Sequence, residues 1–437
     1  MLTLTMPPAI SAAERAVVLD IDGAIGPAVA DYVVREIKAA RPSDVGLIVL
    51  RMNTPGGLDG SMREIVSAIL AAPVAVAAYV APNGARAASA GTYIAYASAI
   101  AAMASGTNIG AATPIRVGGS PFLPDTKPDQ PSEEKDGRKN TGEPADTETR
   151  KVVNDAVAYI RGLAELNNRN ADWATDAVRT AVSIPASEAL KLHVIDVIAD
   201  DVPDLLRKID GRTVLVAGKQ QQLATSGLAV SVVAPDWRTM LLAIITNPNI
   251  AFILMLVGVY GLIFEFLNPG AVAPGLVGSI SLLVALYALN LLPVNFAGAA
   301  LVLLGISLMV AEAHIGAFGA IGIGGIGAFL IGAIMMFPSG EPAFEPSPAV
   351  LAGAAAATAG LFLFLLSMLL RSRRRAVVTG DEVLAGAEGE TVSWQGDEGR
   401  VRLKGEIWLA RAARPLQPGI RVKVIARTGL VLIVEPA

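Results

Sequence analysis

Ser89 has the surroundings most suited to chemistry in this chain of 437 residues. It lies in the stretch APNGARAASAGTYI, residues 82–95, where most of its near neighbours are small. Small residues let another backbone approach closely, which suits either a packed helix or an extended substrate chain. A serine becomes a nucleophile only when a base removes its proton, so the first question is which base the chain supplies.

The sequence supplies few candidate bases. It has no cysteine, and its two histidines are His193, before a strand-like run, and His314, in a long apolar segment. The position of His193 is typical of a packed, structural residue. Lys151 is the better candidate, because we expect it in the first turns of a helix, where the positive end of the helix dipole favours a neutral amine. The alternative is that Lys151 is an ordinary surface lysine.

A polar segment precedes that helix. Residues 116–148 are rich in proline and glycine, which predicts a flexible loop. Solvent keeps the lysines of such a loop charged, which makes them poor bases: Lys127, Lys135 and Lys139.

The elements that would position Ser89 alternate between strands and helices. The runs AVVLDID, VGLIVLRMN and VAVAAYVA read as strands, and a helical pattern follows each of them. This order predicts βαβ units and a mostly parallel, covered sheet, in which ligands bind beyond the carboxyl ends of the strands. Gly56, Gly57 and Ser89 all come just after such ends. The helix expected after Ser89 would offer its free N–H groups to an anion.

The second half of the chain is strongly apolar. Hydrophobic residues make up 53% and charged residues 17% of the whole chain, which is too apolar for an ordinary soluble protein. Glu265 and Glu312 lie near the ends of apolar runs, where we expect them at the membrane interface rather than on an ion path. We predict about five transmembrane helices, because five runs each approach the roughly 20 residues that span a bilayer. These runs cover residues 249–267, 272–292, 296–312, 317–337 and 349–370.

The arginine cluster RSRRR, residues 371–375, predicts the orientation of these helices. Arginines clustered at a helix end mark the cytoplasmic side, so five crossings would place the first domain on the outer face. An exported domain needs a signal sequence, and MLTLTMPPAISA lacks both a positive start and an apolar core. Either the signal is absent from this sequence, or the start is misassigned, or the orientation is inverted.

The last part of the chain reads as short strands with turn glycines, which predicts a small barrel. Arg400, Arg402, Lys404 and Trp408 could form a basic, aromatic groove for nucleic acid. The formal net charge of −4 argues against a nucleic-acid partner. We therefore favour a solvated strand face with one core tryptophan.

Three regions of the sequence resemble a known family. TPGG, GARAASAGTYI and GTNIGAATPI resemble the Clp-protease-like domain of the long nodulation-efficiency-D (NfeD) proteins. The segment ITNPNIAFILMLVGVYGLIFEFLNPGAVAPG resembles the membrane region of that family. The stretch from GRVRLKGEIWLARA to the C-terminus resembles its five-stranded OB-fold barrel. The three regions follow one another in the same order as the domains of the family, and the resemblance covers nearly the whole chain.

The resemblance implies a role for four residues. The serine of ASAG, Ser89, matches the family nucleophile, and Lys151 matches the lysine that acts as its base. Gly57, the second glycine of PGG, and Ala90 would supply the N–H groups of an oxyanion hole. The family implies apolar protein segments as substrates, and an extended substrate would be held as an added strand.

We thus expect a multi-domain membrane protein: an α/β ClpP/crotonase-like domain over residues 1–235, a transmembrane helical region over 236–375 and an all-β OB-fold domain over 376–437. The expected function is that of an integral-membrane serine endopeptidase of the cell (inner) membrane. The family implies a homo-oligomer that works with a stomatin/prohibitin-like (SPFH) protein. No cofactor or metal is expected, since no phosphate-binding loop or ligand cluster is present.

The sequence is also compatible with two other functions. The chain could be a membrane scaffold that caps a stomatin-like assembly with weak or no proteolysis. It could also be an acyl-CoA hydratase of the related crotonase architecture, which shares the oxyanion device, although the five apolar runs argue against that function.

Overall fold

The computed structural model describes residues 15–114, 144–315, 319–337, 342–373 and 384–437. By internal contacts the chain separates into two compact units, residues 1–359 and 360–437. The division into three domains at residues 235 and 375 stays a prediction.

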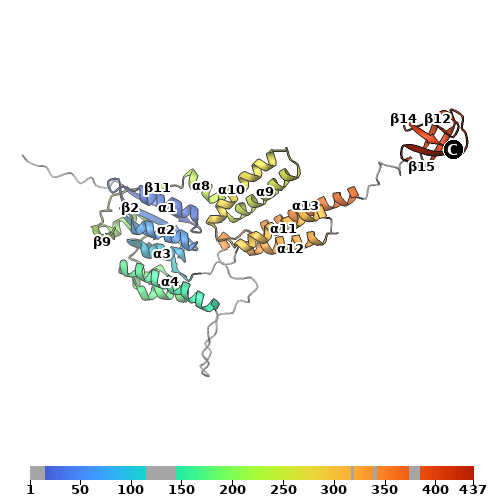
Figure 1. Ribbon diagram of the computed structural model, residues 1–437. Coiled ribbons are helices and arrows are strands. Elements are labelled where there is room, and N and C mark those ends of the chain that lie inside the picture. The colour runs from blue at the N-terminus through green and yellow to red at the C-terminus, as the bar shows by residue number, and fades with distance from the viewer. Residues whose placement is uncertain (1–14, 115–143, 316–318, 338–341, 374–383) are drawn as a thin grey trace, which may run out of the picture. The chain divides into compact units, whose positions relative to one another are not determined.

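A parallel sheet forms the centre of the first domain (Figure 1). Its strands are β-branched or small and apolar, so they suit a sheet that is covered on both faces. Six described strands pair in the order β11-β1-β2-β3-β5-β8, and every pairing is parallel, as the sequence predicts. They are β1 (Arg15–Asp22), β2 (Val45–Asn53), β3 (Ala75–Val80), β5 (Ile100–Met103), β8 (Val197–Ile198) and β11 (Ala229–Val233).

Helices cover both faces of this sheet. Alternate residues of β1 enter different apolar layers, because successive side chains of a strand point to opposite faces. Val17 and Leu19 pack into the larger layer, and Ala16 and Val18 pack into the smaller one. The larger layer contains α1 (Pro27–Ala39), α2 (Asp59–Leu70), α3 (Ala90–Ala97), α4 (Pro144–Leu166), α5 (Ala171–Arg179) and α6 (Ala186–Lys191). The smaller layer contains α7 (Val202–Ile209) and the hairpin of β9 (Thr213–Val216) and β10 (Lys219–Gln222).

A second, small sheet lies beside the first. It joins β4 (Arg86–Ala88), β6 (Asn108–Gly110) and β7 (Ser183–Pro185) in the order β4-β6-β7. Its strands of three residues are too short to carry a periodic pattern, so the sequence does not predict this sheet. It matters for function because β4 ends immediately before Ser89.

The membrane region follows a short helix, α8 (Trp237–Ile245). Five apolar helices occupy the predicted runs: α9 (Pro248–Leu267), α10 (Ala273–Leu291), α11 (Phe296–Ile315), α12 (Ala320–Met336) and α13 (Pro348–Arg373). A 3-10 turn, η1 (Pro342–Phe344), lies between α12 and α13. Among the described residues, the helices long and apolar enough to cross a bilayer are α9, α10 and α13. The apolar parts of α11 and α12 are shorter, at 296–312 and 320–336.

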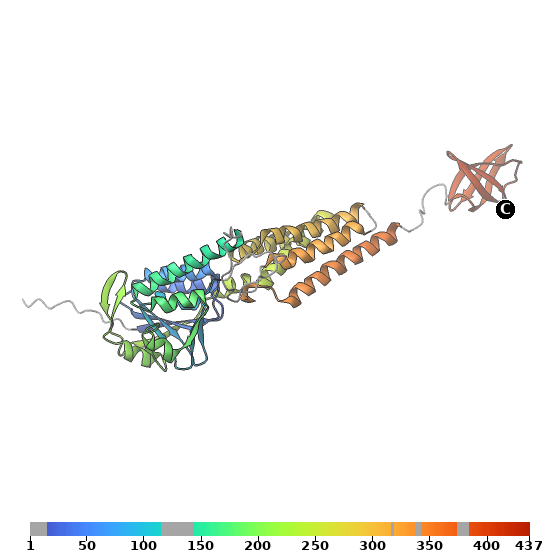
Figure 2. The same cartoon turned by 90° about the horizontal axis from the view of Figure 1, so that it is seen from below.

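The first four of these helices form two similar hairpins, α9 with α10 and α11 with α12, which Figure 1 labels and Figure 2 shows from below. A Cβ on Gly258 would lie 2.7 Å from the Leu282 Cβ, and one on Gly305 would lie 2.5 Å from the Phe329 nitrogen. Gly305 and Phe329 each come 47 positions after their counterparts Gly258 and Leu282. Small residues at helix interfaces allow such close approach of two backbones in a membrane. The two hairpins therefore repeat one packing scheme.

The second compact unit ends in a closed barrel, as predicted. Five described strands close it in the order β12-β13-β14-β16-β15. They are β12 (Glu388–Gln395), β13 (Glu398–Leu403), β14 (Glu406–Arg411), β15 (Arg421–Thr428) and β16 (Val431–Pro436). Val401 and Leu403 of β13 are buried in its core, whereas the alternating Arg400 and Arg402 are exposed.

Candidate active site

Ser89 occupies a sharp turn between β4 and α3. Its φ of 51° and ψ of −117° are unusual for a residue with a side chain. Several hydrogen bonds fix this turn. The Ser89 N–H donates to the Gly110 carbonyl at 3.0 Å, and the buried Thr92 hydroxyl lies 2.9 Å from the same oxygen and 3.0 Å from the Ala87 oxygen. The surrounding strands thus hold the half-buried Ser89 side chain in a set direction.

The glycine turn after β2 forms the neighbouring wall. The buried Thr54 hydroxyl lies 3.0 Å from both the nitrogen and the carbonyl oxygen of Gly56, which closes the turn. Gly56 has a φ of 123°, and a Cβ at this position would lie 2.6 Å from the Ser89 Cβ. A glycine is required here both by the backbone conformation and by the contact with Ser89.

Two N–H groups near Ser89 have no acceptor among the described residues. The Gly57 N–H and the Ala90 N–H, the latter in the first turn of α3, donate no hydrogen bond within the part of the chain that the structure describes. Both residues line the same cavity as Ser89. Unpaired N–H groups at a helix start are suited to hold a negatively charged oxygen.

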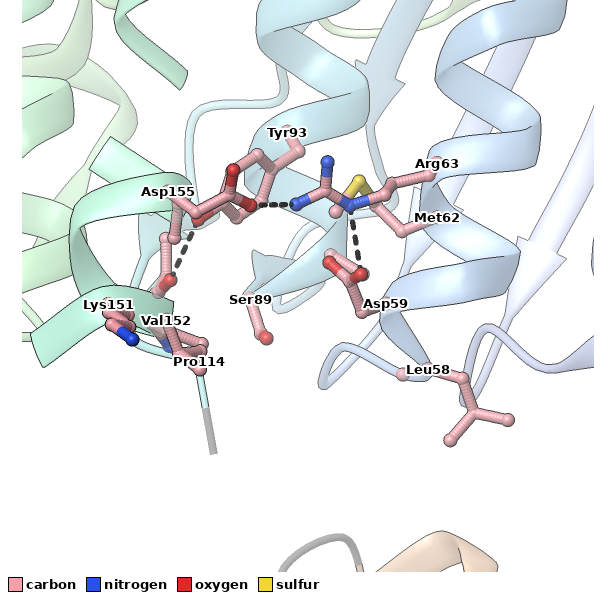
Figure 3. Close-up of a pocket in the computed structure, with 14 residues that line it drawn as sticks. Leu58, Asp59, Met62, Arg63, Ser89, Tyr93, Pro114, Lys151, Val152 and Asp155 are labelled. Carbon is pink, nitrogen blue, oxygen red and sulfur yellow. Dashed lines mark hydrogen bonds and ion pairs between the residues drawn. The ribbon is translucent and has the colours of Figure 1, made fainter. Parts of the chain in front are cut away.

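A cavity of about 490 Å³ brings the four predicted site residues together (Figure 3). The Ser89 hydroxyl points into the space between α2 and α4, and Lys151 lies on α4 (Figure 3). Apolar side chains make up much of the wall, among them Leu58, Met62 and Val152. The cavity can thus accommodate a chain with apolar side chains.

The position of Lys151 differs from the prediction. Helix α4 begins at Pro144, so Lys151 lies two turns into the helix and not in its first turns. The effect of the helix dipole falls off within the first turn, so the dipole does not explain how this amine would become neutral. Lys151 is exposed and makes no hydrogen bond or ion pair within the described residues.

The alternative base, His193, does not reach the cavity. It follows α6, its side chain is exposed, and its φ of 58° places it in a turn. It is absent from the residues that line the cavity. Among the described titratable side chains, the cavity wall contains Lys151, Tyr93, Asp59, Arg63 and Asp155.

Arg63 joins two walls of the cavity, which the sequence analysis did not anticipate. From α2 it donates to Asp59 at 2.9 Å and to Asp155 of α4 at 2.6 Å (Figure 3). Its guanidinium also lies 4.5 Å from the centre of the Tyr159 ring. Burial alone would lower the pKa of Arg63, but its bonds to the two carboxylates raise the pKa above its ordinary value. The i, i+4 spacing of Asp59 and Arg63 is visible in the sequence, but the partner on α4 is not.

Tyr93 closes the cavity from α3. Its hydroxyl donates to the Ala112 carbonyl at 3.2 Å, and its ring stacks on Tyr159 at 6.0 Å between centroids. Burial raises the pKa of Tyr93 well above its usual range, so it stays neutral and acts as a wall.

The carboxylates of the described residues do not gather into a metal site. Within the described ranges, no group of three or more His, Cys, Asp or Glu side chains could hold a metal ion. Glu312, at the end of α11, instead accepts N–H groups at the start of α12, from Gly319 at 2.9 Å, Ile321 at 3.1 Å and Gly322 at 3.3 Å. Its counterpart Glu265 receives a single, longer bond of 3.4 Å from Gly270.

The four barrel residues considered as a nucleic-acid groove lie at or near the surface. Lys404 is exposed like Arg400 and Arg402, and Trp408 is half-buried with the Arg427 guanidinium 5.2 Å from its ring centre. Trp408 packs against the apolar core of the barrel and is also partly in contact with solvent. The arginines lie on the outer face of β13, as expected for a solvated strand.

Two relatives match much of the chain. It is 33% identical over 427 residues to the membrane-bound protease PH1510 of Pyrococcus horikoshii, covering 95% of this chain and 92% of the relative. It is 26% identical over 329 residues to the membrane protein NfeD1b of Bacillus subtilis, covering 72% of this chain and 65% of the relative. A solved structure of the 1510-N membrane protease specific for a stomatin homolog, from Pyrococcus horikoshii, is 31% identical with a TM-score of 0.43, over 54% of this chain and 100% of the other.

Sequence models of one family match in order along the chain. The model for the NfeD1b N-terminal domain matches residues 16–127, and that for the NfeD integral membrane domain matches residues 249–368. The model for the NfeD-like C-terminal, partner-binding domain matches residues 381–436. Together with the relative matched over nearly its whole length, these matches show that the chain belongs to the NfeD family.

Proposed function

We propose that this protein is an integral-membrane serine endopeptidase with a Ser89–Lys151 dyad. The observation that carries the proposal is the turn at Ser89, whose hydroxyl points into a cavity also lined by Gly57, Ala90 and Lys151. The similarity to a membrane-bound protease over 95% of the chain supports the same reaction class.

The dyad would work in two stages. The Ser89 oxygen attacks the peptide carbonyl carbon while its proton passes to the neutral amine of Lys151. The carbonyl oxygen becomes an oxyanion that accepts the N–H groups of Gly57 and Ala90. The C–N bond then breaks, the leaving amine takes the proton from Lys151, and an acyl-enzyme remains. In the second stage a water molecule gives a proton to Lys151 and its oxygen attacks the ester carbonyl. The bond between that carbon and the Ser89 oxygen then breaks, the Ser89 oxygen takes the proton back from Lys151, and the acid leaves.

Lys151 must be neutral for this reaction, although it is exposed in the free protein. A substrate chain laid in the cavity would cover Lys151 and remove water from it. Desolvation disfavours the ammonium form, so substrate binding itself would favour the base. The apolar walls at Leu58, Met62 and Val152 favour an apolar substrate segment held in extended form.

The proposed orientation of the chain in the membrane depends on whether the number of membrane helices is odd or even. Three described helices meet the requirement for spanning, and counting α11 and α12 gives five. With either odd number the first domain would lie on the face opposite the arginines at 371–375, and clustered arginines favour the cytoplasmic side. We therefore propose an extracytoplasmic protease domain and a cytoplasmic barrel in the cell (inner) membrane.

The barrel is the site for a partner. It matches a partner-binding domain, and we propose that it docks a stomatin/prohibitin-like membrane protein. We also propose that the protein works as a homo-oligomer, and we retain the division into residues 1–235, 236–375 and 376–437. The open alternative is a scaffold for that partner with weak or no proteolysis.

The test uses the full chain in lipid nanodiscs with quenched-fluorescent apolar peptides. Ser89→Ala and Lys151→Ala should each lower kcat/KM by at least about 10³-fold, because nucleophile and base act as a unit. Lys191→Ala, an exposed lysine on α6 outside the cavity, serves as the matched control and should cleave normally. Cleavage that survives both dyad variants would refute the proposal. A wild type that stays inert with its partner restored would favour the scaffold.

A further inference from the structure

Helix α8 exposes an unusually apolar face. Trp237, Met240, Leu241 and Ile244 are between 50% and 68% exposed. Their spacing of i, i+3, i+4 and i+7 puts them on one side of the helix. Large apolar side chains gathered in this way on an element of a folded domain mark a surface that something covers.

The opposite face of α8 is anchored to the first domain. Thr239 is buried, and its N–H and hydroxyl each donate to the Asp236 carboxylate, at 3.0 and 2.9 Å. Arg35 of α1 holds the same carboxylate with both of its terminal nitrogens, at 2.8 and 3.0 Å, and also bonds the Thr239 oxygen at 3.0 Å. The apolar face cannot turn inward without breaking these bonds.

Chain connectivity puts the bilayer next to this face. Only Thr246 and Asn247 separate α8 from α9, the first membrane helix. Such a link spans at most about 11 Å between its flanking Cα atoms. The Asn247 side chain caps α9 by accepting from the Asn249 N–H at 3.0 Å, so α9 begins there as a regular helix. The C-terminal end of α8 must therefore lie near the membrane boundary.

We propose that α8 lies in the membrane interface, with Trp237, Met240, Leu241 and Ile244 immersed in the lipid surface on the side of the first domain. Tryptophan is favoured at this depth, because its ring is apolar and its N–H is polar. Arg238 lies 5.6 Å from the Trp237 ring centre, where its guanidinium can reach lipid phosphates. Helices of this kind bind through buried apolar area and charge. The Arg35–Asp236 pair then ties the first domain to the membrane. This inference rests on the membrane assignment and not on the proposed dyad.

Site-directed spin labelling tests this proposal, since the chain has no cysteine to remove. The full chain in nanodiscs carries one label at Met240→Cys or Ile244→Cys. The matched control is Leu190→Cys, an apolar residue on α6 that is 38% exposed, and Ile253→Cys on α9 is the membrane reference. We expect the ratio of oxygen to nickel-chelate accessibility at residues 240 and 244 to approach that at 253 and to exceed that at 190 several-fold.

Two results would overturn the proposal, and the labels distinguish them. If the label at residue 240 meets the nickel chelate as freely as the label at 190, α8 lies in water and the proposal is wrong. If it is shielded from both reagents and shows dipolar broadening between labels, a second copy of the chain covers α8 instead of lipid. The labelling results do not depend on whether Ser89 and Lys151 cleave peptides, so the two proposals can fail separately.

Discussion

Gly56 and Ser89 contact each other so closely that the shape of the glycine turn and the direction of the serine depend on one another. The turn is closed by Thr54, and the serine is held through Gly110 and Thr92. Residues with such a restricted backbone act as supports, because a shift at one of them moves the reacting atom.

Gly56→Ala should reduce kcat for peptide cleavage by at least about 10²-fold, since misplacement by about 1 Å can have that effect. The new Cβ would lie 2.6 Å from the Ser89 Cβ on a backbone of φ 123°. The control is Gly60→Ala on α2, where no atom lies within 4 Å of the added Cβ. It should cleave normally, and equal activity of both variants would contradict the role of Gly56.

At the scale of elements, α4 carries Lys151 and is held to α2 by the bond between Arg63 and Asp155. This pair is partly exposed, so it stabilises the fold only weakly. Its larger effect would be on the position of α4, and through it on Lys151, which makes Arg63 a positioning residue.

Arg63→Met removes this bond and keeps the apolar stem of the side chain. We expect kcat/KM to fall by about 3- to 10-fold, with a loss of unfolding free energy below about 1 kcal/mol. If Arg63 had only a structural role, its replacement would lower stability and leave the pH profile of kcat unchanged. Because Arg63 is proposed to position Lys151, we expect the pH profile of kcat to change. Arg161→Met is the control, because Arg161 lies on α4, the helix that carries Lys151, and its bond to Asp172 is 3.4 Å long. Equal kinetics for both variants would exclude the positioning role.

The hairpin of α11 and α12 depends on the Glu312 cap. Glu312→Leu leaves three N–H groups without their acceptor and should lower the stability of the hairpin by about 1–3 kcal/mol. Glu265→Leu at the equivalent position of the other hairpin removes one weak bond and should lower stability less. Unfolding of the detergent-solubilised protein by added SDS measures both. A larger effect at 265 would contradict this account.

The sequence predicted the elements better than their contacts. The covered parallel sheet follows from alternating strand and helix patterns, the apolar helices from the length of the apolar runs, and the barrel from short strands with turn glycines. The structure confirms these elements. Helix α4 begins at Pro144, inside the segment 116–148 that the sequence predicts as a loop, because polar residues and a proline there carry no helical pattern. The bond from Arg63 to Asp155 joins residues 92 positions apart, and no local pattern reports it. The family resemblance selected Ser89 and Lys151, and the cavity adds their proximity without testing their roles.

At the scale of the whole molecule, the link between the first domain and the membrane helices runs through α8. The Arg35 guanidinium, through its hydrogen bonds, holds the pKa of Asp236 well below its usual range. A carboxylate with a lowered pKa in the folded state stabilises that state above its ordinary pKa, and this contribution is lost as the pH falls toward the lowered value.

Asp236→Asn should therefore loosen α8 at neutral pH and have little effect in strong acid. Hydrogen–deuterium exchange of residues 237–245, compared between wild type and variant at the same pH, measures this effect. We expect faster exchange in the variant at pH 7, and a difference that shrinks as the pH falls below 3.8, the ordinary pKa of an aspartate. Asp210→Asn, a carboxylate that caps a different segment, is the control. A difference that persists in acid would contradict the assignment.

The backbone at Ser89 has a further consequence. Its φ of 51° and ψ of −117° match the first central position of a type II′ turn, where glycine is preferred. Glycine at this position would relax the turn and at the same time remove the hydroxyl. Selection for thermal tolerance alone would thus drive residue 89 toward glycine, and under the proposed function only selection for turnover would keep the serine.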